Sequence, residues 1–449
     1  MQSLPTIRNI SSCLFFLLIA CKISLAEDTI VKHHSFTIST QIRPKFEFRN
    51  GYHKPFEKGE KPAADISQRN RIRLNYKYKN LFSVQLTPQH VFIWGQDGLT
   101  QGASVKNSLS LYDVWIKLQP TKAIAIQIGR QVISLDDERF FGESDWAQGG
   151  RSHDALSFQF AQKKLDLRTY FAYNQNYREL YNNTMDNHSG SLYTPKNATP
   201  YKWMQAAWAG VKINDKNKMS FLFANFGYQD AKSSKDSAKT YFSQSLGTNY
   251  FYNDANWKLN LSAYYQTGKN AAGFKTNAYL LAFLLNRNIG KKWNVALGTD
   301  FVSGNPVGVA PKKYNQAFSA YGTNHKFYGS MDYFFAGNAH KSTGLADIYL
   351  NVGFKPTAKS ALSLSVHQFL SPNKMQDSTS KSYNCNLGQE IDLGFNYFIF
   401  KFAKLYGGYS LYVTSPSILF LKDVKKSAKV QHWLWLSLDV NLDIFNFKF

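Results

Sequence analysis

The sequence predicts an all-β protein, a transmembrane antiparallel up-and-down β-barrel of about 18 strands. Apolar and polar residues alternate with a period of two along most of the chain, which is typical of strands with two different faces. Very short turns and long polar loops join these strands alternately, and the chain ends on an aromatic residue, Phe449. We expect short periplasmic turns and long extracellular loops.

Composition agrees with this fold class. The chain has 449 residues, a formal net charge of +23 and 16% aromatic residues. Outside the N-terminal segment it lacks the roughly 20-residue apolar run that a transmembrane helix needs. The alternative is a soluble all-β protein. Such a protein would have to bury its apolar strand faces in sandwiches while carrying long loops on one side only.

The N-terminal residues 1–26 resemble a secretory signal peptide. Arg8 precedes the apolar stretch Ile10–Ala20, and the small residues around Ala26 suit a signal peptidase. Cleavage there would leave residues 27–449 as the barrel. Lipidation at Cys21 is the competing interpretation, because Leu18–Cys21 resembles a lipobox.

Cysteine usage limits the chemistry that the exported chain can carry. Only Cys385 lies beyond the predicted signal peptide, so no internal disulfide and no cysteine metal site can form there. We expect no metal and no cofactor.

The strands are assigned in chain order from the alternation and the turns. The first nine are expected over Ser35–Arg49, Gln68–Tyr78, Leu81–Trp94, Leu109–Leu118, Lys122–Val132, Ala155–Ala161, Leu165–Asn174, Trp203–Ile213 and Met219–Tyr228. Later strands meet in pairs at Asn253–Asn256, Asn288–Lys291, Pro356–Lys359 and Phe400–Lys404, and the last covers about His432–Phe449. On that strand Trp433 and Trp435 suit an interfacial girdle, as do Trp257 and Trp293 beside short turns. The longest loop, Ser303–Gly344, either plugs the mouth or covers the surface.

Parity along the strands predicts which side chains face the lumen. In Gln68–Tyr78, Ile72 and Leu74 share one face, and arginines occupy the other. A lipid-facing Arg at midplane costs roughly 2–4 kcal/mol, so a row of them must face inward. The lumen residues expected on this ground are Arg43, Lys45, Arg69, Arg71, Arg73 and Arg168.

The first two strands carry little negative charge to neutralise this basic wall. Glu47 is the only acid on their inward faces, although arginines in large barrels commonly pair with acids. An unpaired basic wall in a confined channel concentrates anions. Arginine suits carboxylates because its planar fork binds them through two hydrogen bonds.

A dense polar stretch, residues 129–156, is expected to form a long loop that folds into the lumen. It contains Arg130, Arg139 and Arg151 among several acids, and Glu138 and Asp154 are expected to position these arginines. Its acids and His153 could also suggest an enzyme. Neighbouring residues of a strand point to opposite faces, which separates His153 from Asp154, and the chain has no nucleophile elbow and no HExxH motif. We therefore expect no enzyme.

The stretch LYDVWIKL…IQIGRQVISLDDERFFGESDWAQGGRSHDAL resembles the alginate export family of outer-membrane barrels. The shared features are Gly129-Arg130-Gln131, Glu138-Arg139, Trp146 and the Arg151–Asp154 segment, with the arginine-rich strand before them. The resemblance implies an 18-stranded barrel with an arginine-rich conduit for a uronate polysaccharide. It assigns conduit roles to Arg69, Arg71, Arg73, Arg130, Arg139 and Arg151.

The sequence thus predicts a channel in the outer membrane of a Gram-negative bacterium. Export of an alginate-like acidic polysaccharide by passive, electrostatically selected diffusion is the first hypothesis. A general or small-anion-selective porin is the alternative. We expect a monomer in contact with outer-membrane lipid and lipopolysaccharide, with periplasmic export partners as an open possibility and no binding of nucleic acid.

Overall fold

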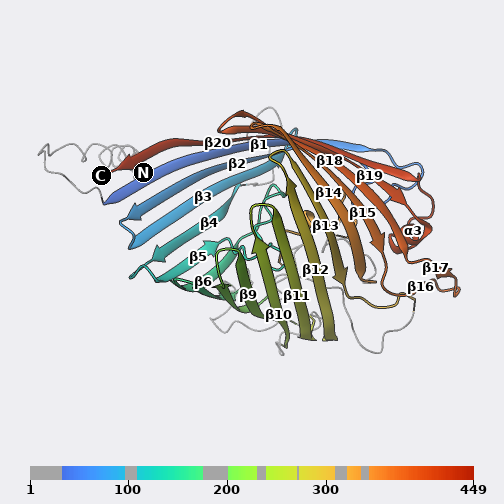
Figure 1. Cartoon of the computed structure of the whole chain (residues 1–449), viewed down its shortest axis with the longest axis horizontal. Coiled ribbons are helices and arrows are strands. Elements are labelled where there is room, and N and C mark those ends of the chain that lie inside the picture. The colour runs from blue at the N-terminus through green and yellow to red at the C-terminus, as the bar shows by residue number, and fades with distance from the viewer. Residues whose placement is uncertain are drawn as a thin grey trace, which may run out of the picture.

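The structure, a computed structural model, describes residues 33–96, 109–174, 201–229, 239–270, 273–308, 321–334 and 343–449. These residues form a closed antiparallel barrel whose wall is an 18-stranded sheet, so the predicted fold is confirmed (Figure 1). The expected signal peptide, with Cys21 and Ala26, lies outside the described residues. So do residues 309–320 and 335–342 of the Ser303–Gly344 loop.

Eighteen long strands make up the wall, and a small hairpin, β16–β17, lies in the loop between β15 and β18. The bounds are β1 His34–Asn50, β2 Ala63–Tyr78, β3 Phe82–Ile93, β4 Leu109–Leu118, β5 Ile124–Gln131, β6 His153–Gln162, β7 Leu165–Tyr173, β8 Trp203–Lys212, β9 Asn217–Gln229, β10 Thr240–Asn253, β11 Trp257–Lys269, β12 Lys275–Ile289, β13 Trp293–Val302, β14 Leu345–Thr357, β15 Ser360–Leu370, β16 Met375–Gln376, β17 Ser382–Tyr383, β18 Asn386–Phe400, β19 Ala403–Thr414 and β20 Val430–Lys448. Two short helices, η1 Asn324–Lys326 and α3 Pro416–Leu421, lie in loops. None of the helices within the described ranges has the length and apolar character needed to cross a membrane.

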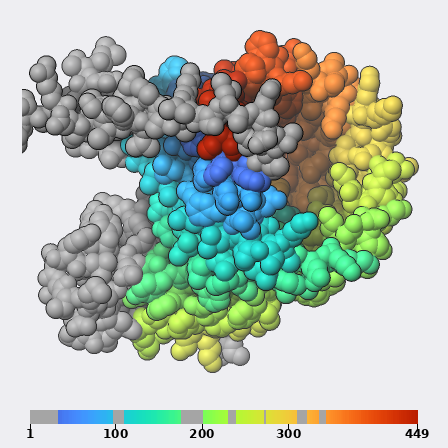
Figure 2. Space-filling view, turned by 90° about the vertical axis from the view of Figure 1, so that its left-hand side faces the viewer, coloured from blue at the N-terminus to red at the C-terminus, as the bar shows by residue number. Residues whose placement is uncertain are grey.

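The first and last strands close the barrel. β1 pairs with both β2 and β20, and the backbone N–H of His34 donates to the carbonyl oxygen of Phe449 at 2.9 Å. Viewed from the end where the termini lie, the molecular surface is hollowed between the blue N-terminal strands and the orange and yellow wall opposite (Figure 2). We call this end, which also carries the short turns, the short-turn end.

The outer face of the barrel is apolar, as the alternation predicts. Ile72, Leu281 and Leu436 are each more than 40% exposed there, and Trp257 and Trp293 lie exposed beside short turns. A closed sheet leaves no unpaired edge, so such a face can contact lipid without exposing backbone donors.

The girdle prediction is wrong for Trp433 and for Trp435, whose ring centroid lies 4.6 Å from that of Trp146 inside the barrel. Leu434 is 43% exposed on the outer face, and the adjacent Trp433 therefore points inward, where it is fully buried. Its ring stacks on Tyr52 with centroids 4.7 Å apart.

Some strands begin earlier than predicted. β2 starts at Ala63 instead of Gln68, because β1 continues to Asn50 and pairs with it as far as Arg49↔Ala63. β6 likewise starts at His153 instead of Ala155. Backbone pairing continues here past the point where the apolar alternation stops.

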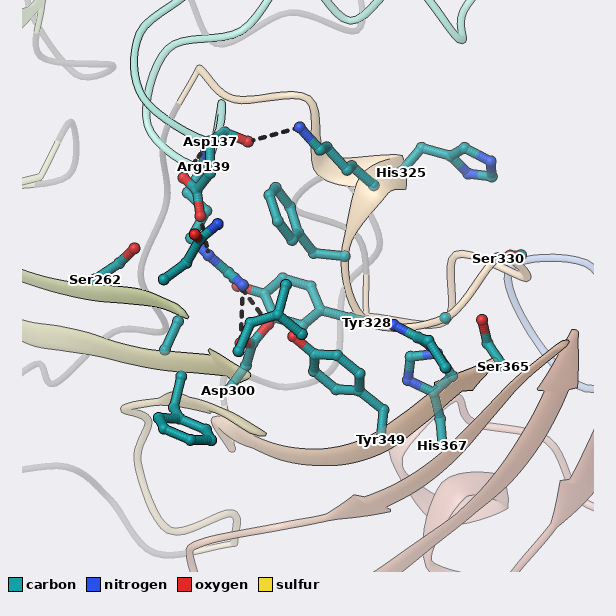
Figure 3. A pocket seen from close by; sticks show the side chains of 18 of the residues that line it. Asp137, Arg139, Ser262, Asp300, His325, Tyr328, Ser330, Tyr349, Ser365 and His367 are labelled. Carbon is teal, nitrogen blue, oxygen red and sulfur yellow. Dashed lines mark hydrogen bonds and ion pairs between the residues drawn. The ribbon is translucent and has the colours of Figure 1, made fainter. Parts of the chain in front are cut away.

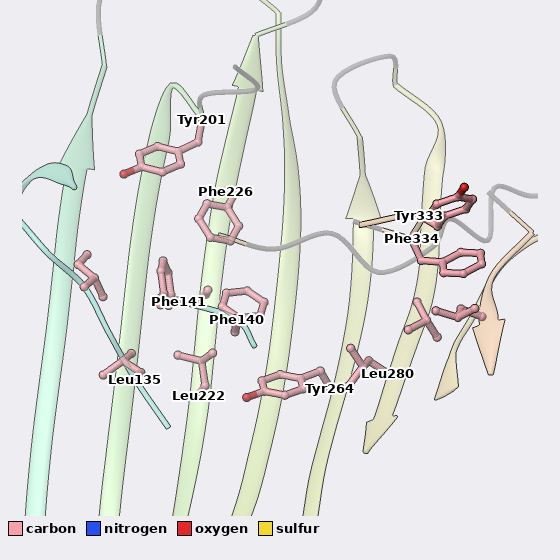
Figure 4. Packing of buried hydrophobic residues seen from close by; sticks show 14 of the residues in the cluster. Leu135, Phe140, Phe141, Tyr201, Leu222, Phe226, Tyr264, Leu280, Tyr333 and Phe334 are labelled. Atoms are coloured by element: carbon pink, nitrogen blue, oxygen red, sulfur yellow. The ribbon is translucent and has the colours of Figure 1, made fainter. Parts of the chain in front are cut away.

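The largest group of buried apolar side chains lies inside the barrel. Residues 132–152, which we call the inner loop, leave β5 and enter the lumen before β6. Phe140 stacks on Phe226 and Tyr264, with ring centroids 6.0 and 5.8 Å apart, and Phe141 is fully buried beside it (Figure 4). The inner loop is therefore packed against β9 and β11 as a protein core is packed.

Replacing Phe141 with alanine should release the inner loop. Removing a buried phenylalanine costs about 3 kcal/mol, which raises the open fraction of the loop roughly 100-fold. The rate of trypsin cleavage after Arg139 or Arg151, followed by mass spectrometry on the barrel in detergent, measures this change. Phe221→Ala, at an outer-face position that is 48% exposed, is the matched control and should leave the rate unchanged. Equal cleavage of both variants would contradict the packing argument.

Candidate functional site

The inner loop is bound to the basic wall by one carboxylate. Asp145 accepts from Arg69 at 2.8 Å, from Arg71 at 3.2 Å and from Arg43 at 3.3 Å. We expected the wall to stay unneutralised, because Glu47 is the only acid on the two strand faces, and this expectation is wrong for these three arginines. The second acid comes from a loop far along the chain, where inspection of the two strands could not find it.

The basic wall is covered by the loop and does not line open space. Arg43 and Arg69 lie directly opposite each other on β1 and β2, and Arg69 is fully buried. Arg43 also donates to the carbonyl oxygen of Asp145 at 2.8 Å and to Gln148 Oε1 at 3.0 Å. Loop carbonyls thus supply acceptors that a passing solute was expected to supply.

A glycine lets the loop come this close. Gly150 has φ +65°, and a Cβ atom there would lie 2.8 Å from Arg71 Nη2 and 2.6 Å from the ring of Tyr112. The guanidinium of Arg71 lies over that ring, 3.5 Å from its centroid. Glycine adopts this backbone conformation without a steric penalty.

Opposing effects act on the pKa of Asp145. Burial alone would raise it, but the guanidinium groups of Arg69 and Arg43 outweigh burial and hold it below the ordinary value for aspartate. The carboxyl is therefore ionised at neutral pH. We call its contact with Arg43, Arg69 and Arg71 the clamp, and this contact requires the charged form.

The other side of the inner loop is bound to the far wall. Both terminal nitrogens of Arg139 donate to Asp300 of β13 at 2.8 Å, and its Nε donates to Asp137 at 2.9 Å (Figure 3). The predicted partner of Arg139, Glu138, is not its partner. Glu138 instead accepts from Ser134 and lies 3.7 Å from Lys326.

A third anchor lies between these two. Asp136 accepts from Trp208 of β8 at 3.0 Å, from Ser220 of β9 at 2.6 Å and from Asn249 of β10 at 3.0 Å. Burial raises the pKa of Asp136, although the hydrogen bonds from Ser220 and Trp208 oppose this. Because β2 and β13 are separated around the wall by β1, β20, β19, β18, β15 and β14, the loop crosses the lumen and forms a constriction.

A cavity of about 250 Å³ remains at the constriction beside Arg139. Its wall comes from strands β11 to β15 and β18, and its other side from the inner loop and residues 325–330. In Figure 3, Tyr328, Tyr349 and His367 lie around the Arg139–Asp300 pair. Sequence analysis did not single out Asp300, Tyr349 or His367, since each is one polar residue on an otherwise ordinary strand.

Two predicted residues lie outside the lumen. Arg130 pairs with Asp154 at 2.8 Å across β5 and β6, and their side chains are 42% and 54% exposed. Arg130 points to the same face of β5 as the apolar outer-face residue Ile128, and Asp154 points to the same face of β6 as Leu156. The prediction of Arg130 as a conduit residue is therefore wrong. Asp154, which we expected only as one of the acids that position the arginines of this stretch, holds Arg130 on the outer face.

Three other predicted residues already have partners within the protein. Lys45 pairs with Glu47 at 3.2 Å, and Arg168 pairs with Asp166 at 2.6 Å on the inner face of β7. Arg151 donates to the carbonyl oxygen of Gly322.

Arg73 differs from the rest of the basic wall. It faces the lumen two residues nearer the short-turn end than Arg71, and it is exposed. Lys77 lies further along the same face and is also exposed. Neither has an ion-pair or hydrogen-bond partner within the described ranges. These two cations lie between the constriction and the short-turn end, where a solute can contact them.

The solved structures that resemble this barrel are outer-membrane porins. Pseudomonas aeruginosa OpdL matches with a TM-score of 0.61 at 13% identity, over 91% of this chain and 99% of that one. P. aeruginosa OccK11 (OpdR) matches with 0.58 at 12% identity over 91% and 96%, and Acinetobacter baumannii OccAB4 with 0.57 at 10% over 94% and 100%. No family model and no curated protein sequence matches the chain. At these identities the likeness shows the fold.

The clamp at Asp145 predicts a dependence on acid. Because its pKa is depressed in the folded state, its stabilising effect is complete above the ordinary aspartate value of about 3.9 and is lost as pH falls below the depressed value. Single-channel conductance should therefore rise below about pH 4 as the loop detaches from the basic wall.

The variant Asp145→Asn should show the high conductance already at pH 7. Asp215→Asn, in an exposed short turn, is the control and should keep the wild-type profile. An unchanged acid transition in Asp145→Asn would show that the clamp does not hold the loop.

Proposed function

We propose that this protein is an outer-membrane porin that passes small polar solutes and favours anions. The observation that carries the proposal is the inner loop fastened to both walls by Asp145 and by Arg139. A loop held at both ends leaves a narrow path, and the cavity beside it has the size of a small solute. An extended polysaccharide needs a continuous wide lumen.

The exposed cations of β2 support the preference for anions. Arg73 and Lys77 have no partner among the described residues, and they face a confined space with low-dielectric walls. Such charges raise the local concentration of anions and lower that of cations. The fold is also that of P. aeruginosa OpdK, which has been crystallised with vanillate, a small carboxylate.

Export of an acidic polysaccharide is the second candidate, and it rests on the sequence resemblance of residues 109–160. It would require the inner loop to leave the lumen and expose Arg43, Arg69 and Arg71. The packing of Phe140 opposes this movement, and so do the two ionic anchors and the hydrogen bonds of Asp136. The small-solute proposal requires no such change.

The proposed setting is the outer membrane of a Gram-negative bacterium. The apolar outer face and the exposed Trp257 and Trp293 near the short turns suit a lipid boundary. We place the short turns in the periplasm and the long loops outside, in contact with lipopolysaccharide, and take the barrel to act as a monomer.

Arg73→Glu should reduce anion preference. Reversing one unpaired lumen charge should lower the ratio of anion to cation permeability on the order of twofold or more. The reversal potential in a planar bilayer under a potassium chloride gradient measures this ratio. Arg73→Lys keeps the charge and should keep the ratio. If Arg73→Glu leaves the reversal potential unchanged, the anion preference does not arise from this residue.

Solute size separates the two candidate functions. Glucuronate and a long uronate oligomer can be added in turn to the short-turn side of a single channel. A porin of the proposed type should be entered by the monomer and not by the oligomer. Translocation of the oligomer through the wild-type channel would favour polysaccharide export instead.

A further inference from the structure

Three polar side chains form a row across β14, β15 and β18, which lie between β13 and β19 in the wall. Asn351 of β14 lies directly opposite Ser365 of β15, and Ser365 lies directly opposite Asp392 of β18. All three line the cavity at the constriction, and Figure 3 shows Ser365 on the same side of it as His367. Neighbouring strands are about 4.8 Å apart, so the row presents oxygen atoms at regular intervals.

Within the part of the chain that the structure describes, no donor forms a hydrogen bond with the carboxylate or amide oxygens of this row. Both carboxylate oxygens of Asp392 are buried without a hydrogen bond, and so is Oδ1 of Asn351. Asp392 is only 8% exposed. The nearest cationic candidate, Nε2 of His367, lies 3.9 Å from Oδ2, which is beyond hydrogen-bond distance, and its Nδ1 is bonded to Asp347 at 3.0 Å.

Leaving such acceptors without a donor is costly. A buried polar group without a partner costs about 1–3 kcal/mol, and a buried charge costs more. A fold that keeps several such acceptors in one row, facing one cavity, is suited to a ligand that supplies the donors.

The surroundings favour a positively charged ligand. Glu390, fully buried on the same face of β18, has one unpartnered oxygen and accepts from the backbone N–H of Met331 at 2.7 Å with the other. Arg139 pairs with both Asp137 and Asp300, and Asp347 is hydrogen-bonded to His367. Glu390 and Asp392 have no comparable cationic partner among the described residues, so negative charge remains on β18.

A primary ammonium group fits these acceptors. It has three N–H donors and no acceptor, and Tyr349 lines the same cavity with an aromatic ring. No three His, Cys, Asp or Glu side chains in the described ranges are grouped to hold a metal ion. We propose that the row Asn351–Ser365–Asp392 binds the ammonium group of an organic solute.

This site deepens the proposed function, on which it rests for the passage of solutes. A solute that carries an ammonium group and a carboxylate would be held by the row at one end. Its carboxylate would be attracted by the positive field of Arg73 and Lys77 on β2. We therefore expect small zwitterions to reside longest in the channel.

Three four-carbon probes separate the contributions: butylammonium, 4-aminobutyrate and butyrate. Calorimetric titration of the barrel in detergent should show binding of butylammonium and 4-aminobutyrate, with butyrate weaker. Asp392→Asn should weaken both ammonium probes at least tenfold and leave butyrate unchanged. Asp443→Asn removes another lumen acid, opposite Ser39 near the short-turn end, and should change none of them.

Ser365→Ala is a second variant, for the case that Asp392→Asn disturbs folding. It removes one acceptor without changing any charge. It should weaken the ammonium probes by a smaller factor while the barrel keeps its resistance to heat in SDS. Equal affinity of the wild-type barrel for all three probes would overturn the proposal, and so would equal losses for all three in Asp392→Asn. Calorimetry measures binding and does not depend on ion conduction. A barrel whose reversal potential contradicts the proposed anion preference can therefore still show the expected binding of the ammonium probes.

Discussion

The constriction depends on one carboxylate among three guanidinium groups. Arg43 and Arg69 are directly opposite each other, with Arg71 beside them, and like charges in opposed positions destabilise a sheet. Asp145 offsets that repulsion and, with the loop carbonyls, supplies acceptors to side chains that have lost most of their water. The position of the inner loop follows from this requirement, and the loop then carries Asp136 and Arg139 to the other walls.

Ionic anchors alone would contribute little net stability, because the cost of removing water from buried charges offsets much of their attraction. The apolar residues of the loop change this. Phe140 and Phe141 pack on β9 and β11 from inside the barrel, so that the lumen contains a small hydrophobic core as well as a polar path. The barrel wall thus has two apolar surfaces with different surroundings. The outer face is suited to lipid, and the inner one is covered by the inner loop.

Much of this was accessible from the sequence and some was not. Strand alternation places Arg69, Arg71 and Arg73 inward, since it needs only local information. The same rule, applied consistently, would have placed Arg130 outward with Ile124 to Ile128, and Trp433 opposite Leu434. The ion pairs of Asp145 with β2 and of Arg139 with Asp300 join segments remote in the sequence, and no local pattern encodes them. The row on β14, β15 and β18 depends likewise on register, which turns and bulges set jointly along the wall.

The distribution of charge around the lumen has a consequence beyond the sign of the solute. Arg73 and Lys77, inward cations without a partner among the described residues, lie on β2, whereas Glu390 and Asp392, which have no close cationic partner there, lie on β18. The field at the constriction therefore has a component across the channel, and a solute with separated charges lowers its energy there only in one orientation. A solute with a single charge is attracted by one wall and repelled by the other, so the two contributions to its electrostatic energy oppose each other. Selection at this point acts on the arrangement of charge within the solute, while the exposed cations nearer the short-turn end act on its net sign.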